Sequence, residues 1–288
     1  MRVLRKFTDF VLFSNIFISL CAAASAWETF LLAGKTNWHY LLFVFCSTFV
    51  FYNMQRVLLS RDYVSEDSSE RHRWIARHIR LLTVLSGIAF IASIPLVIKW
   101  EWKLVLVFAF FCVLATLYFI PKVNLRTIPG LKAVYISLLW TFSTVVFPSL
   151  LIGFRLEKGY LWLLAAERFF FILPLCIVFN IRDIDYDRKR GVRTLPVLIG
   201  VGATKIISAS LVFIFSALLI YRCYFYGLVV KFGESMQPFV PALLVSGLIT
   251  LLALLFADKK RSEYYYILVV DGMILLQAVL VFLTEVFL

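Results

Sequence analysis

Two carboxylates in one short segment have the spacing for metal or phosphate chemistry. Asp183 and Asp187 are four residues apart, so on a helix they lie one above the other on the same face. Two stacked carboxylates can hold a hard divalent cation, and that cation can hold a phosphate. Asp185 lies between them and is a further candidate ligand. The alternative is a solvated helix end, where these acids balance neighbouring cations such as Arg188 and Lys189.

The helices that must position this segment are predicted from the apolar composition. With 62% apolar and 16% charged residues, the chain cannot be an ordinary soluble domain. We therefore expect one all-α membrane domain over residues 1–288, with nine transmembrane helices joined by short connections. Each predicted helix matches an apolar stretch near the ~20 residues that cross a bilayer. The stretches are residues 10–32, 38–59, 81–98, 102–120, 131–151, 160–181, 203–230, 238–257 and 264–288.

The basic residues predict the orientation in the membrane. Most of the 29 Lys and Arg residues fall in connections on the same side as the N-terminus, and cytoplasmic loops carry such an excess. We therefore expect the N-terminus in the cytoplasm and the C-terminus outside, in an integral protein of the plasma (inner) membrane. The net charge of +12 then reflects this topology and an affinity for anionic lipid, not nucleic-acid binding.

The longest polar connections divide the predicted bundle. They follow the second and the sixth apolar stretches, which suggests two four-helix halves with a ninth helix added. Residues 51–56 can be laid over residues 178–183, because each segment has an aromatic residue followed by Asn. Internal repeats are common in membrane folds that bind a ligand between halves. In this overlay Arg56 occupies the place of Asp183.

The pattern around the two carboxylates resembles a known signature. Residues 180–196 resemble the second aspartate-rich motif of the UbiA superfamily of intramembrane prenyltransferases, Asn-x-x-Asp-x-x-x-Asp-Arg-x-x-Gly-x-x-Thr-Leu-Pro. The matching positions are Asn180, Asp183, Asp187, Arg188, Gly191, Thr194, Leu195 and Pro196. Tyr118 and Lys122 are similar to the family's Tyr-x-x-x-Lys motif at the cytoplasmic end of its fourth helix.

This resemblance implies an activity and a set of site residues. The family transfers an isoprenyl group from an isoprenyl diphosphate, so we expect an aromatic or lipid acceptor and surrounding membrane lipids. In this family Mg²⁺ holds the diphosphate between two Asp-rich helix ends, and an apolar channel holds the prenyl tail. Asp183 and Asp187 are then the catalytic metal ligands, with Asp185 as a third. The candidates for holding the diphosphate are Asn53, Arg56, Tyr118, Lys122, Asn180 and Arg188.

The family's first motif, Asn-Asp-x-x-Asp-x-x-x-Asp, is incomplete in this chain. It would begin at Asn53, but its acidic positions fall on Met54, Val57 and Arg61. Arg56 adds a positive charge at the same helix end. A two-helix Mg²⁺ clamp therefore cannot be assembled in the usual way.

Three consequences of this loss remain open. In the first, Asp62 and Glu66, four residues apart beyond the helix end, act as substitute metal ligands. In the second, Arg56 and Arg61 contact the diphosphate directly, since guanidinium groups bind phosphate bidentately; the alternative for Arg56 is an ion pair with Asp183. In the third, the chain is a non-catalytic or transporter-like protein that retains the fold and binds a polyprenyl or lipid ligand.

Further charged residues fall inside the predicted spans. Glu167 and Arg168 are adjacent, so on a helix they point apart and need different partners. Asp271 in the ninth stretch is one candidate partner. Such groups can line a proton or substrate path. We interpret them instead as structural pairs between helices.

Overall fold

The computed structural model of the protein describes residues 2–58, 70–117, 128, 130–153, 159–189, 191–226 and 238–287. Within these ranges the chain is helical and contains no strand. The all-α class predicted from the sequence is therefore confirmed for the described residues.

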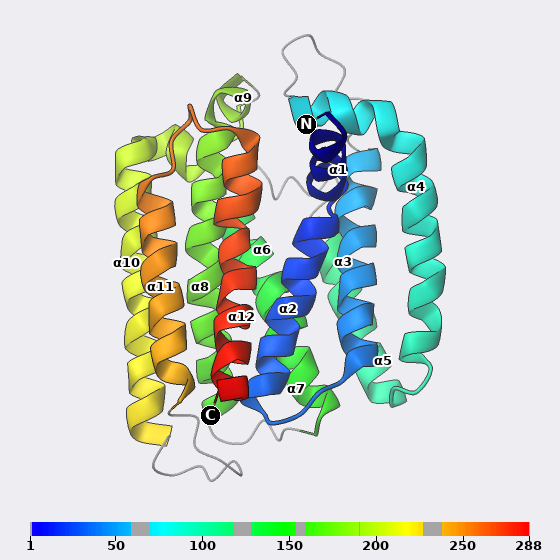
Figure 1. Cartoon of the computed structure of the whole chain (residues 1–288), viewed down its shortest axis with the longest axis vertical. Helices are drawn as coiled ribbons and strands as arrows, with labels where there is room; N and C mark the ends of the chain where they lie inside the picture. Colours follow the sequence, from blue (N-terminus) through cyan, green and yellow to red (C-terminus); the bar gives the residue numbers. More distant parts are fainter. Residues whose placement is uncertain are drawn as a thin grey trace.

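Long helices lie side by side in one bundle (Figure 1). The elements are α1 (Arg2–Phe13), α2 (Ile16–Leu32), α3 (Trp38–Leu58), α4 (Glu70–Val97), α5 (Trp102–Leu117), α6 (Leu131–Thr141), η4 (Phe142–Val146), α7 (Phe147–Leu151), α8 (Tyr160–Arg182), α9 (Ile184–Lys189), α10 (Leu195–Tyr226), α11 (Phe239–Leu255), η5 (Tyr265–Val270) and α12 (Gly272–Phe287). The π-helical segments η4 and η5 continue into α7 and α12. The N-terminus and α9 lie at one end of the bundle, and the C-terminus lies at the other (Figure 1).

Among the described residues, five helices are long and apolar enough to cross a membrane. They are α4, the α6–η4–α7 rod, α8, α10 and the η5–α12 rod, and α1 with α2 adds a sixth if this pair, bent by 56°, is one span. The predicted count of nine transmembrane helices is not confirmed. Helix α11 has 17 residues, short of the ~20 that cross a bilayer, and α5 extends to Leu117, the last residue described before residue 128.

The outward faces of several helices are apolar. Ile88 and Ile91 on α4, Phe110 on α5 and Phe213 on α10 are each more than half exposed. Soluble proteins rarely leave so much contiguous apolar surface uncovered, so these faces suit contact with lipid. By contrast, α8 is largely buried and packs against α6 and α10. This central helix leads directly into the Asp183 segment and fixes its position.

Two buried ion pairs tie α8 to its neighbours. The Arg168 guanidinium lies 2.8 Å from the Glu28 carboxylate of α2, and Arg222 of α10 donates to Glu167 at 2.6 Å. The prediction that Glu167 and Arg168 point apart and have different, structural partners is confirmed. The suggestion that Asp271 is one of those partners is wrong, because Glu28 of α2 and Arg222 of α10 supply the opposite charges.

A pair of asparagines holds the break between α1 and α2. Asn15 adopts a left-handed conformation, with φ of 70°, which short polar side chains tolerate. Its Nδ2 donates to Oδ1 of Asn53 at 2.8 Å. The Asn53 Nδ2 donates in turn to the backbone oxygens of Ser14 and Phe49, both at 3.0 Å. The fully buried Asn53 amide is therefore occupied by structural hydrogen bonds.

We expect Asn53→Ala to destabilise the protein by about 2–3 kcal/mol, because it leaves buried polar groups of Asn15 and Ser14 without their partner. The free energy of unfolding in mixed detergent micelles measures this effect. The exposed Thr8 side chain of α1, hydrogen-bonded only within its own helix, provides the control Thr8→Ala. Equal stabilities of the two variants would contradict the role assigned to Asn53.

Candidate functional site

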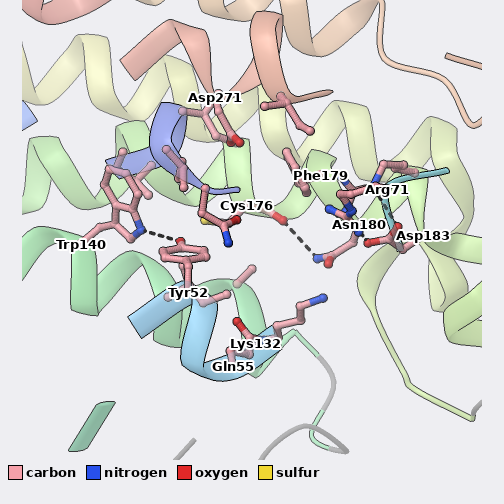
Figure 2. Close-up of a pocket in the computed structure, with 18 of the residues that line it drawn as sticks. Tyr52, Gln55, Arg71, Lys132, Trp140, Cys176, Phe179, Asn180, Asp183 and Asp271 are labelled. Carbon is pink, nitrogen blue, oxygen red and sulfur yellow. Dashed lines mark hydrogen bonds and ion pairs between the residues drawn. The ribbon is translucent and has the colours of Figure 1, made fainter. Parts of the chain in front are cut away.

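A cavity of about 300 Å³ lies at the end of the bundle that carries α9 and the N-terminus (Figure 2). One part of its wall comes from α1, α2, α3 and the start of α4. The other part comes from α6, α8, α9, η5 and α12. The cavity is therefore shared between the N-terminal and C-terminal parts of the chain.

Charged side chains of both signs line this cavity. Figure 2 shows Lys132 extended toward Asn180, with Asp183 and Arg71 grouped beside Asn180 and Asp271 across the cavity. A ligand group with several negative charges would therefore meet positive charge from more than one side. The lining cations come from four helices and are Arg56, Arg71, Lys132 and Arg182. The lining carboxylates are Asp183, Asp187 and Asp271.

The remainder of the wall is largely apolar. Tyr52 and Trp140 provide aromatic faces, and Nε1 of Trp140 donates to the Tyr52 hydroxyl at 3.2 Å (Figure 2). A cavity that combines a charged part with an apolar part suits an amphiphilic ligand with an anionic head. The aliphatic lining residues include Ile18, Ile136, Ile172, Leu175 and Ile274.

Asp183 forms a forked ion pair with its sequence neighbour. Nε and Nη2 of Arg182 donate to the two Asp183 carboxylate oxygens at 2.9 and 2.8 Å. Adjacent helical residues normally point apart, but α8 ends at Arg182 and Asp183 has the non-helical angles φ −94° and ψ 10°. Burial alone would raise the pKa of Asp183, but the Arg182 guanidinium outweighs it and holds that pKa far below its usual range.

The alternative for Arg56, an ion pair with Asp183, does not form. Within the described residues the partner of Asp183 is Arg182, which is closer because it precedes Asp183 in the chain. Arg182 also stacks over the Phe179 ring at 4.2 Å and lies 3.7 Å from Glu263. Arg56 lines the cavity independently of that pair.

The loop after α9 brings the Thr194 hydroxyl into hydrogen-bonding distance of Asp187. Gly191 has φ of 68°, a conformation that glycine adopts without steric cost. The turn brings Oγ1 of Thr194 to 3.2 Å from the Asp187 carboxylate, to which it donates. Burial raises the pKa of Asp187, with Lys132 acting in the opposite direction. The Gly and Thr positions of the motif therefore shape the site, and neither residue is among those that line the cavity.

The structure brings some of the predicted site residues together and separates others. Asp183, Asp187, Arg56 and Asn180 all line the cavity. Asn53 does not line it, and its side chain instead forms hydrogen bonds at the break between α1 and α2. The exposed side chains of Asp185 and Arg188 are also absent from the described wall. The remaining candidates, Tyr118, Lys122, Arg61, Asp62 and Glu66, lie outside the described residues.

The described residues do not fit the expected Mg²⁺ clamp. They contain no group of three or more His, Cys, Asp and Glu side chains that could hold a metal ion. Both carboxylate oxygens of Asp183 accept hydrogen bonds from Arg182, and Asp185 is exposed. On α3, Met54 and Val57 occupy positions where the expected clamp has carboxylates. Mg²⁺ is usually bound through one or two carboxylates together with substrate phosphates and waters, so what the described residues lack is the second acidic helix end of the clamp and an unpaired Asp183.

Several residues of the wall were not predicted from the sequence. Arg71 and Lys132 looked like ordinary cations flanking membrane helices, where Lys and Arg are common. The sequence marks Asp271 as an intramembrane carboxylate, but only as one candidate for a structural ion pair. It follows the π-helical segment η5, and such segments often occur at functional sites. That irregularity cannot be read from the sequence 265–271.

Comparisons with known proteins agree on one family. A family model described as the UbiA prenyltransferase family matches residues 69–266. The solved apo structure of a UbiA homolog from Aeropyrum pernix K1 is similar, with a TM-score of 0.60 and 15% identity over 95% of this chain and 97% of that chain. A solved structure of a digeranylgeranylglyceryl phosphate synthase has a TM-score of 0.58 and 13% identity, over 99% of this chain and 100% of that one. A search of curated proteins finds no match. At these identities the solved structures establish the fold.

Proposed function

Since the chain belongs to the UbiA prenyltransferase family, we propose that this integral membrane protein transfers an isoprenyl group from an isoprenyl diphosphate to an aromatic or lipid acceptor. The observation that carries the proposal is the cavity itself, which joins a cluster of cations to an apolar wall. An isoprenyl diphosphate has the matching halves, an anionic head and an apolar tail.

The geometry suggests how the reaction proceeds. The diphosphate lies among the cations, and the tail lies along Ile136, Ile172 and Leu175. The bond between the allylic carbon and the diphosphate oxygen breaks, and its electron pair leaves with the diphosphate. Fixed cations stabilise this developing negative charge. The faces of Tyr52 and Trp140 stabilise the allylic cation, which the acceptor then attacks.

Asp271 is our candidate for the proton acceptor of this reaction. The acceptor molecule must lose a proton when its new bond to carbon forms, so a carboxylate within the cavity is needed nearby. Asp183 is paired with Arg182, whereas Asp271 makes no ion pair with any described residue. Asp271 also lies across the cavity from Lys132 (Figure 2). We place the acceptor on the Asp271 side and the diphosphate on the Lys132 side.

We also propose an orientation in the membrane and further contacts to the diphosphate. We place the charged end of the bundle and the N-terminus in the cytoplasm, in the plasma membrane, because of the distribution of basic residues. Tyr118, Lys122 and Arg188 remain candidates for contacting the diphosphate through the resemblance alone. Members of this family generally use Mg²⁺, but the chemistry above requires no metal-bound step.

A second candidate function is supported by the paired state of Asp183. A non-catalytic or transporter-like protein that binds a polyprenyl or lipid ligand would need the cavity but no metal site. The missing first motif and the Arg182–Asp183 pair both agree with it. This candidate predicts ligand binding without release of diphosphate.

A transfer assay separates the two candidates. We expect membranes that contain the protein to release diphosphate from tritiated geranylgeranyl diphosphate and to carry the label into a new lipid product. Ile136→Trp places extra volume in the cavity and is expected to lower this activity at least about tenfold, since a misplaced substrate loses its reactive geometry. Ile91→Trp, on the exposed face of α4, is the matched control. Bound label without product would contradict the transferase proposal.

A further inference from the structure

Several cationic side chains that line the cavity have N–H groups without a hydrogen-bond partner. Among the described residues, buried guanidinium nitrogens of Arg56, Arg71 and Arg182 have no hydrogen-bond partner, namely the Nε atoms of the first two and Nη1 of the third. Lys132 makes no ion pair with a described residue either. Buried polar groups are normally hydrogen-bonded, so this set of donors indicates an acceptor that is bound in the working protein.

The carboxylates of the cavity do not supply that acceptor. Asp183 is already held by two donors of Arg182, and Asp187 accepts from Thr194. Glu263, beside the cavity, forms ion pairs with Nε of Arg71 at 3.3 Å and Nη1 of Arg182 at 3.7 Å, without the geometry of a hydrogen bond. Arg56 and Lys132 therefore line the cavity without an ion-pair partner among the described residues, and Arg71 lines it beside them.

A diphosphate group has the charge and the oxygen atoms that this arrangement lacks. Guanidinium groups bind phosphate oxygens through two parallel hydrogen bonds, and an ammonium binds them as a compact charge. Such contacts are stronger in a site of low dielectric constant than in water. The cations also lie on α3, α4 and α6, so together they can contact several oxygens of one ligand.

We propose that Arg56, Arg71 and Lys132 bind the diphosphate of the isoprenyl substrate directly and take the place of the metal, so that binding is independent of Mg²⁺. The inference rests on the proposed function, because it assumes that the ligand is an isoprenyl diphosphate. Asp183 then acts as the counter-ion that holds Arg182 in place, rather than as a metal ligand.

The experiment measures binding of tritiated geranylgeranyl diphosphate to the purified full-length protein in detergent, once with EDTA and once with Mg²⁺. We expect about the same dissociation constant in both conditions. Arg71→Gln is expected to weaken binding in EDTA by about tenfold, the value of one charged hydrogen bond. Arg73→Gln removes an exposed cation two residues along α4 and is expected to leave binding unchanged.

The other outcomes of this experiment distinguish an error in this inference from an error in the proposed function. Binding that requires Mg²⁺ would overturn this inference and leave the proposed function intact. If the Mg²⁺-dependent binding were also lost in Asp62→Asn/Glu66→Gln, those two residues would be the metal ligands. Failure to bind in either condition would overturn the proposed function as well. A loss of binding in Arg73→Gln equal to that in Arg71→Gln would also contradict the inference, since general surface charge would then explain both.

Discussion

Replacing Arg168 with Met is expected to destabilise the protein by about 3–5 kcal/mol, because it leaves a buried carboxylate without its partner. Arg168 contacts Glu28 through two nitrogens, each at 2.8 Å. The same guanidinium donates to Ser25 at 2.6 Å and to Gln277 at 3.3 Å. One side chain thus joins α2, α8 and α12. The Glu28 side chain is only 3% exposed, so water cannot replace the lost contacts.

The free energy of unfolding in mixed micelles tests this prediction, with two companion variants. Arg80→Met removes an exposed cation of α4 and is expected to change stability little. Glu28→Gln/Arg168→Met removes both charges and is expected to recover much of the lost stability, because neither charge of this pair is left buried without its partner. A double variant as unstable as Arg168→Met would contradict this explanation. The loss of stability would then come from the lost packing of the guanidinium and not from the unpaired Glu28 carboxylate.

Replacing Arg56 and Lys132 together is expected to weaken binding of the isoprenyl diphosphate by about a hundredfold, with about tenfold from each single change. The two side chains lie on α3 and α6, so they approach the ligand from different helices. Neither makes an ion pair with a described residue, so their loss leaves no buried carboxylate unpaired. The variant Arg56→Gln/Lys132→Gln should therefore remain folded.

The dissociation constant in EDTA at fixed ionic strength measures the effect. Lys6→Gln/Arg73→Gln is the matched control, because it removes the same net charge from exposed positions near the same end of the bundle. We expect this control to bind the ligand as the unmodified protein does. An equal loss in both double variants would mean that long-range charge, and not direct contact, governs binding.

The motif at residues 180–196 allowed the family and part of the site to be predicted. Asp183 and Asp187 were expected to share one face, and both line the cavity. The pairing of Asp183 with Arg182 could not be predicted, because adjacent residues meet only where the helix ends at that position. The cavity contacts of Arg71 and Lys132 depend on how α4 and α6 pack. No local pattern in the sequence encodes that packing.

The all-α class was also predictable from the sequence, whereas the number of spanning helices and the contacts of Asn53 and Asp271 were not. Apolar stretches of bilayer length gave the all-α membrane class directly. The predicted number of nine spanning helices is not confirmed, since α11, with 17 residues, is shorter than the stretch 238–257 that predicted it. Asn53 matched the start of a family motif, but the hydrogen bonds that occupy it depend on the left-handed turn at Asn15. Asp271 is only one candidate ion-pair partner in the sequence, because its position relative to α2 and α10 cannot be read from a local pattern.

The decisive measurement is a structure of the protein bound to a non-hydrolysable geranylgeranyl thiolodiphosphate, prepared with EDTA. We expect a diphosphate within hydrogen-bonding distance of Arg56, Arg71 and Lys132, with the prenyl tail along Ile136 and Ile172. A diphosphate bound elsewhere, or a cavity filled by the prenyl tail with no phosphate among these cations, would contradict this expectation.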